Sequence, residues 1–167
     1  AMFADPRLRA VICNSRMVRD DLARRFGLDP AKLHVIYNGI DLDDYSPALR
    51  DAHRSRVRQE QGVGEAAPVM LFVGSGFERK GVRALIDAAA MMQESGARLW
   101  IIGKDKHRAR YEAHARAAGV AGRVRFLGPQ QDVRPYYGAA DAFALPTLYD
   151  PFPNAALEAL ASGLPLV

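Results

Sequence analysis

The chain has 167 residues, of which 49% are hydrophobic and 25% are charged. These values are typical of one soluble globular domain, or of one domain and part of another, and the absence of a run of 18 uncharged apolar residues argues against a membrane-spanning helix. Residues 1–60 hold 11 basic and 9 acidic residues and residues 61–167 hold 12 and 10, so the net charge of +4 is not gathered into the basic block that a nucleic-acid binder more often shows.

Strand-like and helix-like segments alternate along the chain. Short apolar runs next to turn residues predict strands, and apolar residues three and four positions apart predict helices. The expected elements are a strand over 10–13, a helix over 15–26, a strand over 33–37, a helix over 48–61, a strand over 69–73, a helix over 81–94, a strand over 99–102, a helix over 108–118, a strand over 124–127, a helix over 133–138, a strand over 142–145, a helix over 154–161 and a strand over 164–167.

This order predicts an α/β fold with a Rossmann-like parallel sheet. Strands joined through helices form parallel βαβ units, and right-handed crossovers place the helices on both faces of the sheet. Ligands of such sheets bind beyond the carboxyl ends of the strands. The chemistry is therefore expected in four loops, at residues 74–80, 103–107, 128–132 and 146–154.

The first of these loops reads Gly74-Ser75-Gly76-Phe77-Glu78-Arg79-Lys80-Gly81. Arg79 stands where a dinucleotide fingerprint needs glycine, and no Gly-Lys-Ser/Thr follows, so neither common nucleotide motif fits. Two cations at a helix N-terminus are unfavourable unless an anion compensates them, which predicts a phosphate site. The alternative is a solvent-facing pair with Glu78 as its partner.

The last loop, residues 146–154, leads into the helix that carries Glu158. Its three prolines and two aromatic residues make it stiff, and Asn154 suits a helix N-cap. The carboxylates of Asp150 and Glu158 can accept hydrogen bonds from the paired hydroxyls of a sugar or ribose, while amides near Asn154 face a phosphate. Helix capping and compensation of the helix dipole explain the two acids equally well.

The sequence offers no metal site and no nucleophile. The four histidines lack metal-ligand spacing, and no Gly-x-Ser-x-Gly elbow occurs. The chain has a single cysteine, Cys13, which excludes an internal disulfide and favours a reducing compartment. Because Cys13 lies in an apolar run, its side chain is expected to be packed rather than reactive. The triplet Asp41-Leu42-Asp43 lies in an irregular polar stretch away from the predicted strand ends, so a structural role is expected.

The motifs now described resemble those of the retaining, GT-B-fold glycosyltransferases of family 4. That family carries Glu-Gly-Phe-Pro-Asn-x-x-x-Glu followed by Ala-x-Ala-x-Gly-x-Pro-Val, and here residues 150–158 read Asp-Pro-Phe-Pro-Asn-Ala-Ala-Leu-Glu, with Gly163 and Pro165 beyond them. Residues 72–81 look like its phosphate loop, and residues 35–41 look like its interdomain hinge. Residues 101–106 are similar to the lipopolysaccharide-core glucosyltransferase branch, and the resemblance covers nearly the whole chain.

The resemblance implies half of a GT-B fold. Residues 1–41 would be the end of the acceptor-side domain and the hinge, and residues 42–167 a nucleotide-sugar-binding domain, truncated at its C-terminal end. The chain is therefore expected to be a fragment of a longer enzyme and inactive as a transferase by itself, because the acceptor wall is missing.

The resemblance also assigns roles to residues. Arg79 and Lys80 would hold the donor diphosphate and stabilise the leaving phosphate in place of a metal, and Asp150 would bind hydroxyls of the donor sugar. The family usually has Glu where Asp150 stands, which shortens the reach of that carboxylate by one methylene. Glu158 would bind the ribose diol, Lys104 and the 127–133 stretch would surround the base, and the 154–156 amides would meet phosphate or sugar. The full donor-binding set is Gly74, Ser75, Gly76, Lys104, Leu127, Val133, Pro153, Asn154, Ala155, Ala156 and Glu158.

The expected function is the donor-binding part of a metal-independent retaining glycosyltransferase. It would transfer a hexose from a nucleotide diphosphate sugar, expected to be UDP-linked, to a glycan or lipid-linked acceptor held by the missing domain. No cofactor, no metal and no nucleic-acid partner is expected. The expected location is the cytoplasm, and lipid-linked substrates leave peripheral contact with the inner face of the cytoplasmic membrane open.

Two alternatives to this function stay open. One is a GT-B-fold nucleotide-sugar epimerase, which would share the phosphate site. The other is a non-enzymatic module that binds anions, either nucleic acid or anionic lipid, through the basic clusters at 54–58 and 104–110.

Overall fold

The computed structural model describes residue 3 and residues 5–92 and 96–167. The contacts within the chain divide it into two compact units. The first unit comprises Ala1–Gly39 together with Asp150–Asn154, and the second comprises Ile40–Tyr149 together with Ala155–Val167. Each unit is described by itself.

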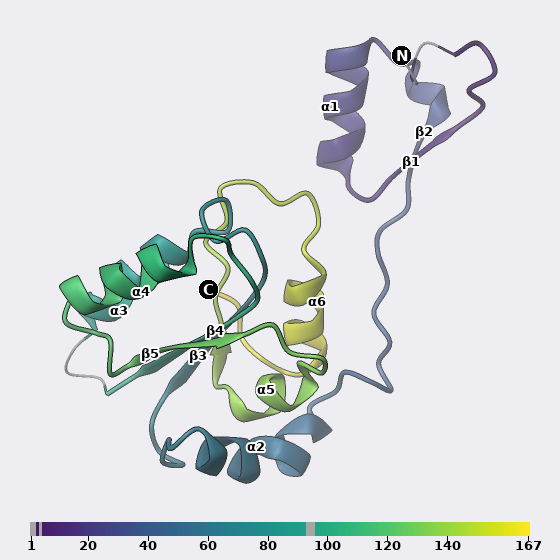
Figure 1. Ribbon diagram of the computed structural model, residues 1–167. Helices are drawn as coiled ribbons and strands as arrows, with labels where there is room; N and C mark the ends of the chain where they lie inside the picture. Colours follow the sequence, from purple (N-terminus) through teal and green to yellow (C-terminus); the bar gives the residue numbers. More distant parts are fainter. Residues whose placement is uncertain (1–2, 4, 93–95) are drawn as a thin grey trace. The chain divides into compact units, whose positions relative to one another are not determined.

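The first unit is a small βαβ arrangement. Strand β1 (Val11–Cys13) pairs in parallel with β2 (Leu33–Val35), and α1 (Arg16–Phe26) and the short 3₁₀ helix η2 (Pro30–Lys32) connect them (Figure 1). A serine before a helix and a glycine after it are the residue types that the sequence predicts as its caps, and both take that role: the side chain of Ser15 accepts a hydrogen bond from the Val18 amide, and Gly27 ends the helix at φ 61°. The second strand is shorter than predicted, because Ile36 and Tyr37 turn out to be exposed.

The core of the second unit is a four-stranded parallel sheet with strand order β5-β4-β3-β6. Its strands are β3 (Val69–Val73), β4 (Arg98–Ile102), β5 (Val124–Gly128) and β6 (Ala142–Phe143). The helices of this unit are α2 (Ala48–Glu60), α3 (Val82–Met91), α4 (Arg108–Ala117), α5 (Arg134–Ala139) and α6 (Asn154–Ala161), whose first residue belongs to the first unit.

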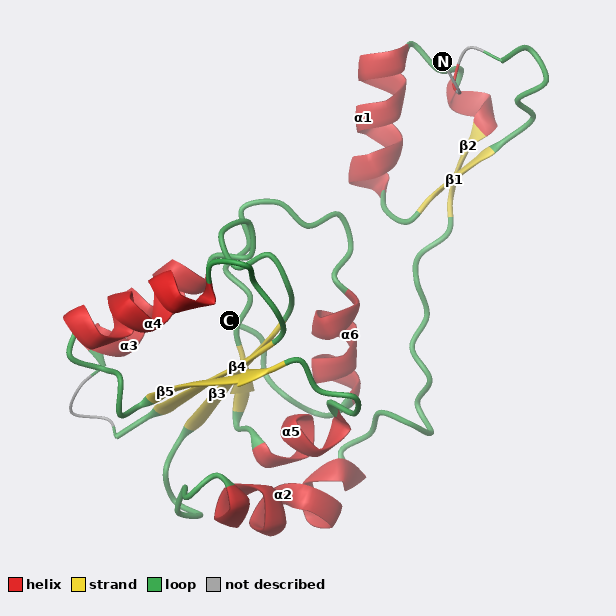
Figure 2. Ribbon diagram, viewed as in Figure 1, coloured by secondary structure: helices red, strands yellow, loops and turns green. Residues whose placement is uncertain are grey.

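Helices cover both faces of this sheet, as predicted (Figure 2). Alternate strand residues point to opposite faces, so Phe72 and Ile101 pack with α3 and α4, whereas Leu71 and Trp100 pack with α2, α5 and α6. The two clusters are almost entirely apolar, which explains why β3 and β4 read as continuous hydrophobic runs.

Besides β2, three predicted elements differ from the structure by more than one residue. The helix expected over 81–94 begins at Val82, because Gly81 adopts φ 77°, and Glu94 lies outside the described residues. The strand expected over 142–145 has only two residues, although the Ala144 amide still donates to Leu71 O at 2.9 Å. The strand expected over 164–167 is a single bridge between Leu166 and Phe143.

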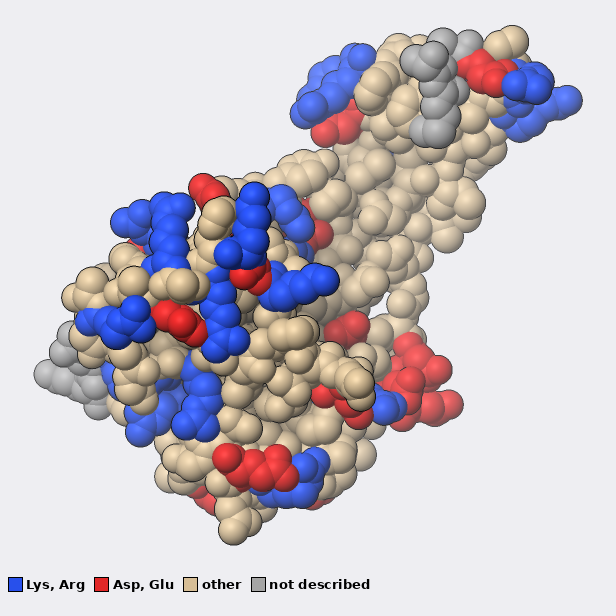
Figure 3. Space-filling view, viewed as in Figure 1, with Lys and Arg blue, Asp and Glu red and all other residues tan. Residues whose placement is uncertain are grey.

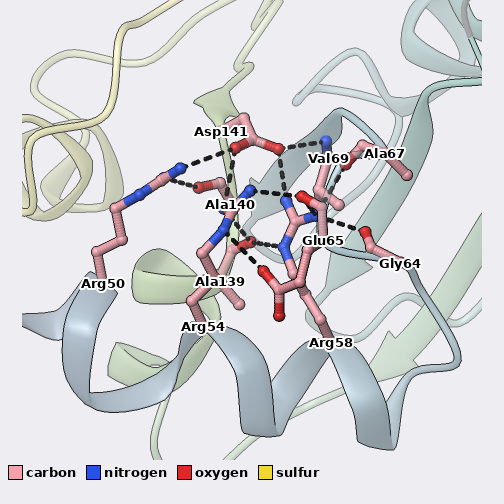
Figure 4. A network of polar contacts seen from close by, with 10 residues as sticks. All are labelled: Arg50, Arg54, Arg58, Gly64, Glu65, Ala67, Val69, Ala139, Ala140 and Asp141. Atoms are coloured by element: carbon pink, nitrogen blue, oxygen red, sulfur yellow. Dashed lines mark hydrogen bonds and ion pairs between the residues drawn. The ribbon is translucent and has the colours of Figure 1, made fainter.

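A polar network ties α2 to the amino end of the sheet (Figure 4). Arg50, Arg54 and Arg58 stand four residues apart on α2 and therefore share one face of the helix. Arg54 and Arg58 both donate to Ala139 O, at 3.3 and 2.9 Å, and so satisfy the C-terminal end of α5. All three guanidinium groups contact the carboxylate of Asp141, with Arg58 Nη2 at 2.5 Å.

This network corrects one sequence-based expectation. The cluster at 54–58 was offered as a basic surface, but the side chain of Arg58 is 0% exposed and that of Arg54 is 16% exposed. Both charges are turned toward backbone carbonyls and Asp141, so this half of the proposed anion-binding module is wrong.

Candidate functional site

The loop after β3 is in backbone contact with the loop after β4, at the carboxyl end of the sheet. The Gly74 amide donates to Ile102 O at 2.9 Å. Gly103 adopts φ 132°, and a Cβ placed on it would lie 1.9 Å from Gly74 O. Only glycine allows this approach, which brings the two loops together where the sequence predicted the chemistry.

Side chains reinforce the contact between these two loops. Ser75 Oγ accepts a hydrogen bond from the Lys104 amide at 3.2 Å, and the Gly76 amide donates to Lys104 O at 3.3 Å. Asp105 Oδ2 accepts from the amide of Phe77, whose ring is buried. The amides of Gly76 and Phe77 thus already donate within the protein and are not available to an anion at this loop.

The cationic part of the loop after β3 is joined to the loop after β6. Arg79 O accepts hydrogen bonds from the Leu148 amide at 2.9 Å and from Thr147 Oγ1 at 3.2 Å. The Arg79 guanidinium donates to Tyr149 O at 2.6 Å. A Cβ on Gly81 would lie 2.0 Å from Pro146 O, so these two loops also touch through their backbones.

Lys80 lies next to Gly74. Its Cδ and Cε atoms are 3.7 Å from the position that a Cβ on Gly74 would take. The small residues of the loop therefore make room for the aliphatic stem of a cation. The alternative, a solvent-facing pair with Glu78 as its partner, stays open.

Glu158 lies one turn inside α6, and its carboxylate is held by α5. Glu158 Oε2 accepts a hydrogen bond from the Tyr137 hydroxyl at 2.8 Å. Ala155 and Ala156, in the first turn of α6, are half-buried against the core cluster that contains Leu71 and Trp100. Amides in the first turn of a helix have no acceptor within the helix, so this turn can still donate to a ligand.

Two of the predicted base-binding residues are partly core residues. Leu127 and Val133 are half-buried and pack against the same cluster as Tyr137. Leu127 O accepts a hydrogen bond from the Gln130 side chain at 2.8 Å, which orders the turn between β5 and α5. Their predicted contact with a base stays a prediction.

Asp150, Pro153 and Asn154 belong to the first unit. There the Asn38 side-chain amide donates to Asn154 Oδ1 at 2.7 Å, and the rings of Tyr37 and Phe152 are 5.2 Å apart. Their predicted joint action with Arg79 and Lys80 therefore stays a prediction.

The part of the chain that the structure describes contains neither a cluster of metal ligands nor a membrane-spanning helix. No group of three or more His, Cys, Asp or Glu side chains close enough to hold a metal ion is found there. No helix among those residues is long and apolar enough to cross a membrane. The Asp41-Leu42-Asp43 triplet forms a local turn, in which Asp41 Oδ1 accepts from the Asp43 amide, as the structural interpretation predicted.

Basic side chains gather on the α3–α4 side of the second unit, interrupted by single acidic residues (Figure 3). Between these two helices lies a cavity of about 640 Å³, with Pro146 and Leu148 at one end. Its lining includes Ala84, Tyr111 and Ala117 but none of the predicted donor-binding residues. The cavity is therefore evidence neither for nor against the roles predicted for the donor-binding residues.

Two residues that order the site were missed in the sequence. Asp105 accepts from Phe77 and, through Oδ1, from the His107 amide at 2.7 Å, an arrangement that its place just before a helix could have indicated. Tyr137 lies on a six-residue helix, and its hydroxyl contacts Glu158. Nothing in the sequence pattern indicates that these two residues are in contact.

Comparison with known proteins identifies the family of the chain. The sequence family described as "Glycosyl transferases group 1" matches residues 67–167, and the one described as "Glycosyltransferase Family 4" matches residues 2–44. The lipopolysaccharide core biosynthesis glycosyltransferase LpsE of Rhizobium meliloti is 41% identical over 101 residues, which are 60% of this chain and 29% of LpsE. The lipopolysaccharide glucosyltransferase WaaG of Escherichia coli is 33% identical over 151 residues, which are 88% of this chain and 40% of WaaG.

Two solved structures share the fold. The crystal structure of WaaG, a glycosyltransferase involved in lipopolysaccharide biosynthesis, has a TM-score of 0.82 and 30% identity, covering 93% of this chain and 42% of that one. Anabaena Alr3699/HepE in complex with UDP-glucose has a TM-score of 0.83 and 26% identity, covering 95% and 44%. The chain thus spans less than half the length of each of these proteins.

Proposed function

Because the chain belongs to the group 1 glycosyl transferases, we propose that it forms the donor-binding part of a retaining glycosyltransferase. The donor is a nucleotide diphosphate sugar, with UDP as the nucleotide, and the group transferred is a hexose. The complex of HepE with UDP-glucose supports this choice of donor, since HepE shares the fold and 26% of its sequence.

The observation that carries the proposal is the position of Arg79 and Lys80. Both follow β3 at the carboxyl end of a parallel sheet, where such folds bind ligands, and backbone contacts with two neighbouring loops fix them there. When the bond between sugar and phosphate breaks, negative charge grows on the leaving diphosphate. Fixed cations stabilise that charge without having to reorganise, which lowers the barrier.

The remaining donor contacts follow from α6. The amides of Ala155 and Ala156 lie in its first turn and suit a phosphate or a sugar oxygen. The carboxylate of Glu158 accepts hydrogen bonds from the two ribose hydroxyls. Asp150 accepts hydrogen bonds from hydroxyls of the donor sugar. Its side chain is one methylene shorter than that of glutamate, so its carboxylate reaches less far toward the sugar.

Transfer needs an acceptor as well as a donor. We assign the acceptor, a glycan or lipid-linked glycan, to parts of the enzyme beyond the donor-binding unit, since the matched relatives are more than twice as long as this chain. Residues 1–41 are the end of the acceptor-side domain and the hinge. This chain alone is then expected to bind donor but not to transfer sugar at a useful rate.

Calorimetric titration with UDP, GDP and ADP tests the donor site. UDP should bind most tightly, and Lys80→Ala should weaken it by about tenfold to a hundredfold, because hydrogen bonds to charged groups contribute about 1.5–3 kcal/mol. Lys106→Ala is the matched control, since Lys106 is an exposed lysine in the next loop and has no assigned role. Equal affinities of the Lys80→Ala variant and the wild type would remove the phosphate assignment.

An epimerase would share this phosphate site but would act on the donor alone. Incubation of the full-length enzyme with UDP-sugar and no acceptor separates the two functions. A transferase should leave the UDP-sugar unchanged until an acceptor is added. An epimerase should convert it to a different UDP-sugar in the absence of an acceptor.

A further inference from the structure

Tyr137 makes a buried contact with the residue assigned to the ribose. The side chain is 0% exposed, and its hydroxyl lies 2.8 Å from Glu158 Oε2 and 3.2 Å from Ala155 O. A hydroxyl has one hydrogen, and the charged, nearer acceptor is the stronger one. The hydrogen bond therefore goes to Glu158.

The helix that carries Tyr137 is held firmly in place. A Cβ on Gly138 would lie 2.2 Å from Leu49 O, so α5 packs directly on the backbone of α2. The carbonyl of Ala139 accepts from both Arg54 and Arg58. The ring of Tyr137 also packs on Phe143, with centroids 5.9 Å apart. The hydroxyl is thus a fixed point against which a carboxylate can be oriented.

The hydrogen bond uses only one of the two carboxylate oxygens. Burial and the nearby charge of Glu158 raise the pKa of Tyr137 far above its ordinary value, so the hydroxyl stays protonated and acts as a donor. No hydrogen bond to Glu158 Oε1 is found among the described residues. Glu158 is half-buried, so this second oxygen can meet a ligand.

We propose that Tyr137 is a positioning residue, which orients the Glu158 carboxylate toward the ribose hydroxyls of the nucleotide. This role rests on the proposed function, since it requires that Glu158 binds ribose. Without the hydroxyl, the carboxylate would rotate among several orientations, and binding would have to fix it at a cost in affinity.

The test compares UDP with 2′,3′-dideoxy-UDP, which lacks both ribose hydroxyls. Tyr137→Phe should weaken UDP binding by about threefold to tenfold, the loss of an ordinary hydrogen bond, and should leave the affinity for the dideoxy analogue unchanged. Tyr136→Phe is the matched control, because it removes the same hydroxyl from the neighbouring residue, whose ring packs on Trp100. In a Glu158→Ala background, Tyr137→Phe should have no further effect on UDP affinity.

A second variant keeps the test decisive if Tyr137→Phe impairs folding, which thermal unfolding would reveal. Glu158→Asp withdraws the carboxylate from Tyr137 and from the ribose together, so it should weaken UDP binding at least as much as Tyr137→Phe, and the loss should again be confined to UDP. Equal weakening of both nucleotides by Tyr137→Phe, or no weakening, would overturn the positioning role while leaving the donor site intact. A wild-type chain that binds no nucleotide would instead overturn the proposed function, and the role of Tyr137 with it.

Discussion

The two ends of the sheet in the second unit use arginine and lysine in opposite ways. At the amino end, Arg54 and Arg58 point inward to carbonyl groups and to Asp141. At the carboxyl end, Arg79 and Lys104 are exposed and Lys80 is half-buried, on loops joined by close backbone contacts. The charges at the first end stabilise the fold, and those at the second end are placed where a ligand can reach them.

The comparison shows that a basic cluster cannot be interpreted from its composition alone. Spacing separates the two cases, because residues four apart on a helix share a face and can serve one buried partner. Arg50, Arg54 and Arg58 have that spacing. Arg79 and Lys80 instead are adjacent residues between a strand and a helix, so their side chains do not share a helix face.

The largest expected effect is on stability at the amino end. Arg58→Met removes the donor to Ala139 O and leaves Asp141 without its closest cation, which should cost about 3–5 kcal/mol of unfolding free energy. Urea unfolding measures this loss. Arg56→Met is the matched control on the same helix, since Arg56 is exposed and contacts only nearby side chains of that helix among the described residues, Glu60 at 2.7 Å and His53 at 3.4 Å, and it should cost about 0.5 kcal/mol or less.

The same variants can break the comparison between the two ends. Folded Arg58→Met should bind UDP nearly as the wild type does, because its contacts lie away from the carboxyl ends of the strands and α5 keeps its hydrogen bond from Arg54 and its contact with Leu49 O. Equal unfolding free energies for the two arginine variants would mean that the buried network does not stabilise the fold. A selective loss of UDP affinity would mean that the two ends are not separate.

The next effect concerns the loop contact at the carboxyl end. Gly81→Ala forces a side chain into φ 77° and places its Cβ 2.0 Å from Pro146 O, so the two loops must move apart. We expect a loss of about 2 kcal/mol or more in unfolding free energy and weaker UDP binding. Gly76→Ala has nearly the same φ but nothing within 4 Å of its Cβ, and it should cost about 1 kcal/mol.

These two glycine variants separate close approach from backbone strain. Unfolding free energies from urea and UDP affinities from calorimetry are the measurements. If Gly76→Ala weakened UDP binding as much as Gly81→Ala, strain within the loop or the predicted donor contact of Gly76, rather than the contact with Pro146, would set the geometry of the site.

Much of the fold could be predicted, because it depends on patterns that are local in the sequence. The apolar runs at β3 and β4 and the glycine at position 27 identified strands and a helix end directly. The short β6 could not be predicted, since its length depends on how far the chain stays hydrogen-bonded to β3, and that is a tertiary property.

The site was predictable only as far as it lies next to strand ends. The positions of Arg79, Lys80 and Lys104 after their strands followed from the topology rule for parallel sheets. The hydroxyl of Tyr137 and the carboxylate of Asp105 act across the fold, on residues 21 and 28 positions away. Such partners depend on side-chain geometry, which sequence spacing does not determine.

A smaller effect is expected in the pH dependence of stability. Burial raises the pKa of Asp141, but the hydrogen bond from the Val69 amide and the charges of Arg58 and Arg54 outweigh it, so the pKa lies below its ordinary value. The folded state therefore gains stability from this carboxylate above an unfolded pKa of about 3.9, and loses it as the pH falls through the folded pKa.

The unfolding free energy of the wild type should accordingly begin to fall below about pH 5 and continue to fall as the pH drops through the lowered folded pKa of Asp141. Asp141→Asn should reduce this fall. Asp132 also has a lowered pKa, owing first to its hydrogen bond with Arg134, but its side chain is 47% exposed and solvent screens the interaction. Asp132→Asn should leave the fall in unfolding free energy at low pH nearly as steep as in the wild type. A larger change in this fall for Asp132→Asn than for Asp141→Asn would contradict the role given to Asp141 and its arginine partners.

The smallest expected effect is that of a chelator on donor binding. If the cations at the carboxyl end neutralise the diphosphate themselves, UDP affinity should be the same with EDTA as with Mg²⁺. A divalent ion would bring two positive charges to the diphosphate, and the side chains of Arg79 and Lys80 bring the same number from fixed positions on one loop. Calorimetric titration of the wild type in both buffers is the measurement, with Lys80→Ala as the sensitive background. Tighter binding in Mg²⁺ by the wild type would show that the loop needs a metal partner, whereas rescue by Mg²⁺ confined to Lys80→Ala would show that the lysine occupies the place a metal could otherwise take.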